Sequence, residues 1–191
     1  MIFALLALVM LFGSASAQGV CALPGRDGSA NISGIVNTYY RVNATNATYS
    51  AGTTPTIPLT GKRGNLTASL APGDLVLIIQ MQCANINSSD NLNYGDGPGG
   101  NNDQIVGGSG YTTSAPGECQ AGRYEFVRAG PGTTDSQLVV ASPLQYSYAH
   151  RPNQNLRRTM QVIRVPQYLD ATLTGTVTAP PWDGFTGGVV V

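Results

Sequence analysis

The sequence contains few charged residues and almost no lysine. Charged residues make up 10% of its 191 residues, whereas an average soluble domain has about a quarter, and Lys62 is the only lysine. Acidic and basic side chains are equal in number, so no field of either sign draws nucleic acid to the surface. We therefore expect no nucleic-acid partner.

Residues that commonly serve in catalysis are equally scarce. His150 is the only histidine and would have to serve in any Ser-His-Asp or Cys-His arrangement, but we expect it on the surface or in a loop. Glu118 and Glu125 are the only glutamates. Glu125 lies between Tyr124 and Phe126 in a strand-like run, so we expect it to face solvent. With no Gly-x-Ser-x-Gly elbow either, the sequence assigns no catalytic residue and predicts that the domain is not an enzyme.

A long apolar run occurs only at the start of the chain. Residues 1–12 are uniformly apolar, and Ala15-Ser16-Ala17 has the small-x-small pattern of a signal-peptide cleavage site. Twelve apolar residues are too few to span a membrane, which takes about 20, and a buried core helix is the alternative. We expect residues 1–17 to be a signal peptide and the mature chain to be secreted or at the cell surface, not integral to the membrane.

The mature chain has the composition of an all-β protein. Glycine (24) and proline (12) together form roughly a fifth of the chain, and helix interiors tolerate neither. Residues 43–64, with Pro55 and Pro58, are interpreted as a loop or irregular edge. The strongest run, Asp74–Gln82, is apolar from Leu75 to Ile79 and predicts a central strand covered on both faces. Short strands with turns between them predict a β-sandwich or small barrel. The strand-like runs are Ile35–Val42, Asp74–Gln82, Arg123–Ala129, Gln137–Ala141, Thr159–Val165 and Ala171–Thr178.

Three cysteines follow the signal segment, in a compartment where disulfides form. Cys83 ends one strand-like run and Cys119 comes just before another, so a disulfide between them would close the base of the intervening loop. Cys21 would then be free or would pair between chains. No Cys-x-x-Cys or Cys/His spacing favours a metal site, and three unpaired thiols are the remaining alternative.

The long segment between these cysteines, Ala84–Gly117, is rich in glycine and asparagine. A loop of this length in a compact domain is commonly functional or mobile, and we interpret it as a binding loop. Its oxygen-bearing side chains suit a hard cation, so calcium is the metal that it would take, although Asn and Asp also form turns without a metal. We therefore expect no obligatory cofactor. The candidate calcium ligands are Asp90, Asn93, Asp96 and Asp103, and the other binding-loop residues are Tyr94, Asn101 and Asn102.

Several short segments, taken in order, resemble the N-terminal domain of large secreted bacterial surface proteins of the gliding-motility or adhesin-like type found in myxobacteria and their relatives. They are Pro72–Gln82, Tyr94–Gly97, Gly122–Glu125, Val162–Tyr168 and Ala179–Gly184 with Gly187-Gly188 after it. The resemblance implies that residues 18–170 form a head or cap domain. It also implies that residues 171–191 begin a Gly-rich β-repeat region, often of β-helix type.

The chain ends on an apolar run, Val189-Val190-Val191, that we interpret as the start of another strand. Such a strand either docks at a sheet edge or continues, and we expect the sequence to be the front piece of a longer protein. The expected function is a non-catalytic, adhesin-like surface domain that contacts cell-surface or matrix components, glycans among them. The alternatives are an accessory module of a secreted polysaccharide-degrading enzyme and a carbohydrate-binding module. The last would present exposed aromatic residues on one sheet face, whereas the aromatic residues here are dispersed and strand packing accounts for most of them.

Overall fold

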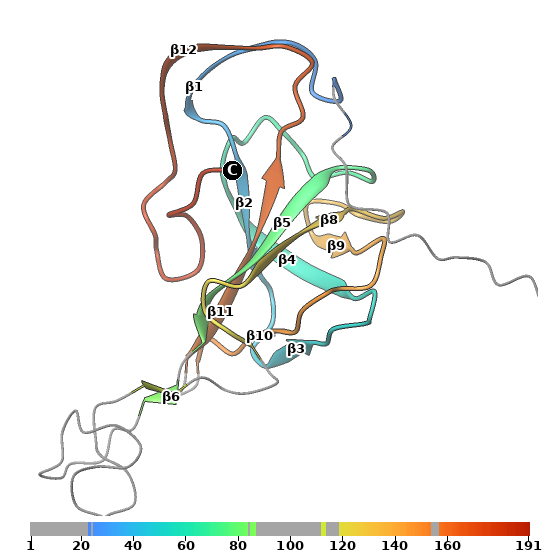
Figure 1. Ribbon diagram of the computed structural model, residues 1–191, viewed down its shortest axis with the longest axis vertical. Coiled ribbons are helices and arrows are strands. Elements are labelled where there is room, and N and C mark those ends of the chain that lie inside the picture. The colour runs from blue at the N-terminus through green and yellow to red at the C-terminus, as the bar shows by residue number, and fades with distance from the viewer. Residues whose placement is uncertain (1–22, 24, 84, 87–111, 114–118, 154–156) are drawn as a thin grey trace, which may run out of the picture.

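The computed structural model describes residues 23, 25–83, 85–86, 112–113, 119–153 and 157–191 (Figure 1). All regular elements within these ranges are strands, which confirms the all-β prediction. No helix in the described ranges is long and apolar enough to cross a membrane. The strands are β1 (Ala30–Ile35), β2 (Thr38–Val42), β3 (Ala47–Tyr49), β4 (Thr56–Gly64), β5 (Leu75–Cys83), β6 (Asn85–Ile86), β7 (Thr112–Thr113), β8 (Tyr124–Arg128), β9 (Gln137–Val139), β10 (Tyr148–His150), β11 (Arg158–Val165) and β12 (Ala171–Thr178).

The centre of the molecule is a six-stranded antiparallel sheet in the order β8-β5-β11-β2-β4-β9. The sheet curls on itself, so that Ala129, just after β8, forms a bridge with Val140, just after β9. This half-barrel agrees with the predicted sandwich or small barrel. Its inner face carries the main core, a cluster of buried side chains that includes Tyr40, Ile78, Leu138, Met160 and Val162.

Strand β5 has the central position that its apolar sequence predicts. It lies between β8 and β11, and the side chain of Ile78 is 0% exposed. Because successive residues of a strand point to opposite faces, Val76 and Ile78 enter the inner core while Leu75 and Leu77 join a second cluster on the outer face. Both faces of the strand are therefore covered along its first half.

Two predictions about the first third of the mature chain are wrong. The run Ile35–Val42 is not one strand, because β1 leaves the barrel to pair with β12 and β2 joins the central sheet. Residues 43–64 are not a loop, because they contain β3 and the nine-residue β4. Strand β4 accommodates Pro58 because this residue lies opposite Asn43, one position past the end of β2, and Asn43 donates to its carbonyl at 2.8 Å. The missing proline N–H therefore removes no bond from within the β2–β4 ladder.

Residues 171–191 pack on the barrel in two ways. Strand β12 pairs in parallel with β1 at one end of the molecule (Figure 1), and it is exposed almost throughout, more than the predicted half-exposed strand. Residues 187–191 do not form the predicted strand. They lie across the outer face, where Val189 and Val191 contact the cluster of Tyr39, Leu75, Leu77, Ile163 and Val165.

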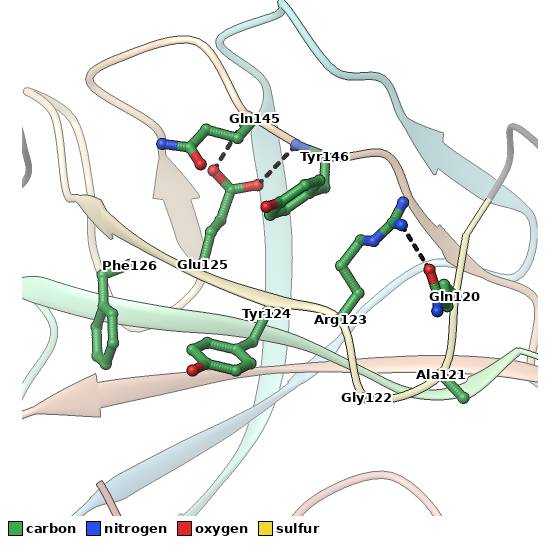
Figure 2. Close-up of a pocket in the computed structure, with 9 residues that line it drawn as sticks. All are labelled: Gln120, Ala121, Gly122, Arg123, Tyr124, Glu125, Phe126, Gln145 and Tyr146. Atoms are coloured by element: carbon green, nitrogen blue, oxygen red, sulfur yellow. Dashed lines mark hydrogen bonds between the residues drawn. The ribbon is translucent and has the colours of Figure 1, made fainter. Parts of the chain in front are cut away.

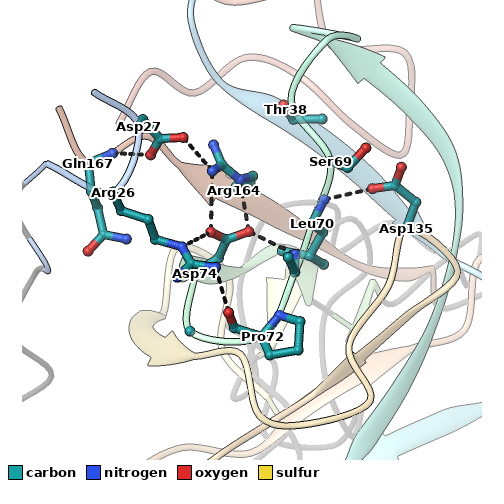
Figure 3. A network of polar contacts seen from close by, with 12 residues as sticks. Arg26, Asp27, Thr38, Ser69, Leu70, Pro72, Asp74, Asp135, Arg164 and Gln167 are labelled. Atoms are coloured by element: carbon teal, nitrogen blue, oxygen red, sulfur yellow. Dashed lines mark hydrogen bonds and ion pairs between the residues drawn. The ribbon is translucent and has the colours of Figure 1, made fainter. Parts of the chain in front are cut away.

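A buried network of ion pairs ties the start of the described chain to the barrel (Figure 3). The carboxylate of Asp74 accepts hydrogen bonds from Arg26 Nε (2.6 Å) and Arg164 Nε (2.9 Å). Asp27 in turn accepts hydrogen bonds from the Arg164 guanidinium and from the backbone N–H of Gln167. Arg26 and Asp27 lie in the segment that precedes β1, and Arg164 lies on β11. The network therefore fixes the segment before β1 against the sheet.

Candidate functional site

The predicted disulfide is present. Cys83 at the end of β5 and Cys119 are joined, with their Cα atoms 6.1 Å apart. Both cysteines are buried beside Ala149. The short β6–β7 pair follows directly, with Asn85 opposite Thr113, so the two ends of the Gly/Asn-rich segment are held together by a covalent bond and a ladder. Cys21 lies outside the described residues.

The seven residues predicted for calcium or ligand binding in this segment all lie outside the described residues: Asp90, Asn93, Tyr94, Asp96, Asn101, Asn102 and Asp103. Calcium binding and the binding loop therefore stay predictions. Within the described ranges, His, Cys, Asp and Glu side chains form no group of three or more that would hold a metal ion.

His150 is not the surface or loop residue that the sequence suggested. It lies on β10 and is completely buried, because β10 packs against β11 and β5 and pairs with β3. Its Nδ1 accepts the backbone N–H of Met160 at 3.3 Å, which places the proton of the neutral ring on Nε2. Burial, with the nearby positive charge of Arg41, lowers the pKa of His150 from 6.5 to about 4. The imidazole is thus a neutral part of the core that solvent does not reach.

Glu125 is also buried, which corrects the prediction that it faces solvent. It lies opposite Ile78 in the β5–β8 ladder and therefore points to the inner face. Its two carboxylate oxygens accept the backbone N–H groups of Gln145 (2.9 Å) and Tyr146 (3.2 Å). Burial, together with the negative charge of Glu125, raises the pKa of the neighbouring Tyr148 above its ordinary value. Glu125 thus holds the 145–146 turn against the barrel on the side of β8 that faces away from β5, where the described residues supply no strand partner.

An open pocket of about 720 Å³ surrounds this edge strand (Figure 2). Tyr124 and Phe126 project from one side of β8, whereas Glu125 and Tyr146 lie on the other side. The rings are accessible: Tyr124 is 55% exposed, and Phe126 and Tyr146 are each 38% exposed. The pocket is lined by Gln120, Ala121, Gly122, Arg123, Tyr124, Glu125, Phe126, Gln145 and Tyr146.

Polar groups in the pocket are already oriented. The Arg123 guanidinium lies over the Tyr146 ring, 4.8 Å from its centroid, and donates to Gln120 Oε1. This contact and the hydrogen bond that the Tyr146 N–H donates to Glu125 hold Tyr146 at the pocket from two directions. Tyr124 and Phe126 meet edge to face, with centroids 6.3 Å apart, as aromatic pairs prefer. Flat apolar rings beside amide and guanidinium groups suit a ligand that has both apolar faces and hydroxyl groups.

Sequence reasoning missed this pocket although part of its signal was visible. Tyr124 and Phe126 alternate in one strand, so they had to share a face, but the sequence does not show that this face stays exposed. Tyr146 comes from a turn some 20 residues later, and its position depends on the burial of Glu125. No known protein family, curated protein or solved structure matches this chain.

Proposed function

We propose that this chain is a non-catalytic extracellular domain that binds glycans through the pocket around β8. The proposal combines two of the expected functions, an adhesin-like surface domain and a carbohydrate-binding module. Each of them functions by binding a ligand and not by catalysis. The observation that carries it is a set of three exposed rings around the edge strand β8, with Tyr124 and Phe126 on one side of the strand and Tyr146 on the other. Single exposed hydrophobic residues are ordinary on protein surfaces, but several gathered in one pocket favour a binding site.

The chemistry of the pocket supports a sugar ligand. One face of a pyranose ring presents polarised C–H groups, which pack on the electron-rich face of an aromatic ring. Its hydroxyl groups both donate and accept hydrogen bonds, and the side chains of Gln120, Arg123 and Gln145 supply matching groups at the pocket. The low net charge of the chain also favours a ligand that is recognised by stacking and hydrogen bonds over one held by long-range attraction.

The same pocket supports binding better than hydrolysis. Hydrolysis of a glycosidic bond ordinarily uses two carboxyl groups that flank that bond. Among the nine lining residues that the structure describes, Glu125 is the one that carries a carboxyl group. Both of its oxygens accept backbone N–H groups, so it acts as a structural support for the turn that carries Tyr146.

A glycan array followed by calorimetry on the best ligand tests the proposal with the disulfide-intact chain. We expect Tyr124→Ala and Tyr146→Ala each to weaken binding about tenfold or more, which corresponds to about 1.4 kcal/mol. Tyr124→Phe should retain most of the affinity, because it keeps the ring. Leu173→Ala is the matched control, since Leu173 is also an exposed large apolar residue but lies on β12 and does not line the pocket.

Three results would overturn this proposal. The first is an array on which the folded domain binds no glycan. The second is glycan binding that both tyrosine variants leave unchanged, which would place the site elsewhere. The third is turnover of a glycoside substrate that Glu125→Gln abolishes, which would make the pocket an active site.

A further inference from the structure

Residues 187–191 lie across the outer face of β2 and β11, and side chains of the sheet bind their backbone at every second residue. The end of this segment lies beside β2 (Figure 1). The amide of Gln161 bonds both the N–H (2.9 Å) and the carbonyl (3.0 Å) of Gly187. The Tyr39 hydroxyl donates to the Val189 carbonyl at 2.6 Å. The amide of Asn37 bonds both the N–H (3.0 Å) and the carbonyl (3.1 Å) of Val191.

These contacts recognise a peptide backbone and not particular side chains. A carboxamide has one acceptor and an NH₂ donor, so it can pair with the N–H and C=O of one residue as a neighbouring strand would. Asn37, Tyr39 and Gln161 are all completely buried. Val189 and Val191 turn toward the sheet and pack on its outer cluster, while Val190 points away and is 50% exposed. The face thus fits an extended segment with branched apolar residues at alternate positions.

The segment begins with two glycines that follow a firmly anchored loop. Asp183 pairs with Arg63 at 2.6 Å, and the Arg41 guanidinium lies 3.5 Å from the centroid of the Phe185 ring. Gly187 and Gly188 then adopt positive φ angles of 100° and 73°, conformations that other residues rarely take. Residues 188–191 can therefore leave the sheet by rotation at the glycine pair while the loop before them stays in place.

We propose that Asn37, Tyr39, Leu77 and Ile163 form a docking groove for an extended Val-x-Val peptide from another molecule, and that residues 188–191 occupy the groove in cis. In the groove, Asn37 supplies a donor and an acceptor to one residue, and Tyr39 supplies a donor to the residue two positions before it. Apolar side chains of the outer cluster lie beneath the two valines. Strand-like peptides bind in this manner, with affinity from backbone bonds and specificity from alternate side chains. This proposal is independent of glycan binding at β8.

The test uses the full chain and a synthetic peptide, acetyl-Thr-Gly-Gly-Val-Val-Val-amide. In the Val189→Asp, Val191→Asp double variant, the segment should leave the groove, because two carboxylates would otherwise be buried against apolar side chains. NMR titration into the millimolar range should then show saturable binding, with shifts at the Asn37 side-chain amide and at Tyr39. The unmodified chain should bind the peptide at least about tenfold more weakly than the double variant does. Its own residues 188–191 compete for the groove at a high effective concentration.

Three controls make the result specific. Val190→Asp alters an exposed residue of the same segment, so this variant should behave like the unmodified chain. Asn37→Leu in the double variant should abolish peptide binding, and so should a peptide with aspartate at the two buried valine positions. Absence of saturable binding to a folded double variant would overturn the proposal.

Hydrogen exchange of the unmodified chain gives a second measurement that needs no variant. The Val191 N–H, which Asn37 accepts, should exchange through local opening, at a free energy well below that of the β11 amides. If this N–H exchanges only with global unfolding, the segment is a fixed part of the fold and the proposal fails.

Discussion

The substitution Asp74→Asn tests how firmly the ion-pair network holds the segment before β1 to the barrel. The Asp74 side chain is 1% exposed, and it accepts four hydrogen bonds: from Arg26 Nε, from Arg164 Nε and Nη2, and from the backbone N–H of Ala71. Asparagine has the same shape but carries no charge, and it turns an NH₂ group toward at least one of these donors. Of its two described carboxylate partners, the buried Arg164 guanidinium then keeps Asp27.

Removing one member of a buried ion pair costs about 3–5 kcal/mol, because the other charge stays buried without full compensation. Arg26 is partly exposed and Arg164 retains Asp27, so we expect the lower end of this range, about 3 kcal/mol. Urea unfolding should show a lower midpoint with an unchanged m-value. Asp170→Asn is the control, because Asp170 is exposed and should change stability by less than about 0.5 kcal/mol. A loss below about 1 kcal/mol for Asp74→Asn would refute this account of the network.

Two further predictions concern the disulfide and the buried histidine. Replacing Cys83 and Cys119 by alanine should cost about 4 kcal/mol, from the closure entropy of a loop with a sequence separation of 36, and urea unfolding with and without reductant measures this loss. Equal stability of the oxidised and reduced chains would contradict it. The pKa of His150 is about 4 in the folded chain and about 6.5 when unfolded, so the unfolded state binds more protons between these values. Stability should therefore fall by about 3 kcal/mol as the pH drops from 6.5 to 4, and His150→Gln should lack this slope.

The strands that sequence reasoning placed well are those whose own residues decide their burial. The apolar run of β5 could only be stable with both faces covered, and β8, β11 and β12 show β-branched or aromatic patterns within their own bounds. The cysteine pairing followed from positions at the two ends of one segment. In each of these cases the deciding information was local.

The failures share a different cause, which is that burial was decided by distant segments. Glu125 looked like the polar member of an alternating strand, but the strand is curled so that this residue faces the barrel interior, where the 145–146 turn meets it. His150 lies on a strand of three residues that becomes part of the core through its contacts with β3, β5 and β11. The prolines of residues 43–64 suggested a loop. The sequence does not reveal that Pro58 lies past the end of β2, where its missing N–H breaks no bond between β2 and β4.

The buried amides give a rule that would have found part of this arrangement from the sequence. Asn37, Gln80 and Gln161 each interrupt an apolar, strand-like run, and each is completely buried. Such an amide is stable in a core only if its donors and acceptor are all paired, and uncharged backbone groups are the partners that need no counter-charge. Gln80 pairs with the backbone of Ala149, which brings β10 against the barrel, and the other two pair with residues 187–191. A carboxamide inside an apolar strand therefore predicts that another chain segment crosses the sheet at that point.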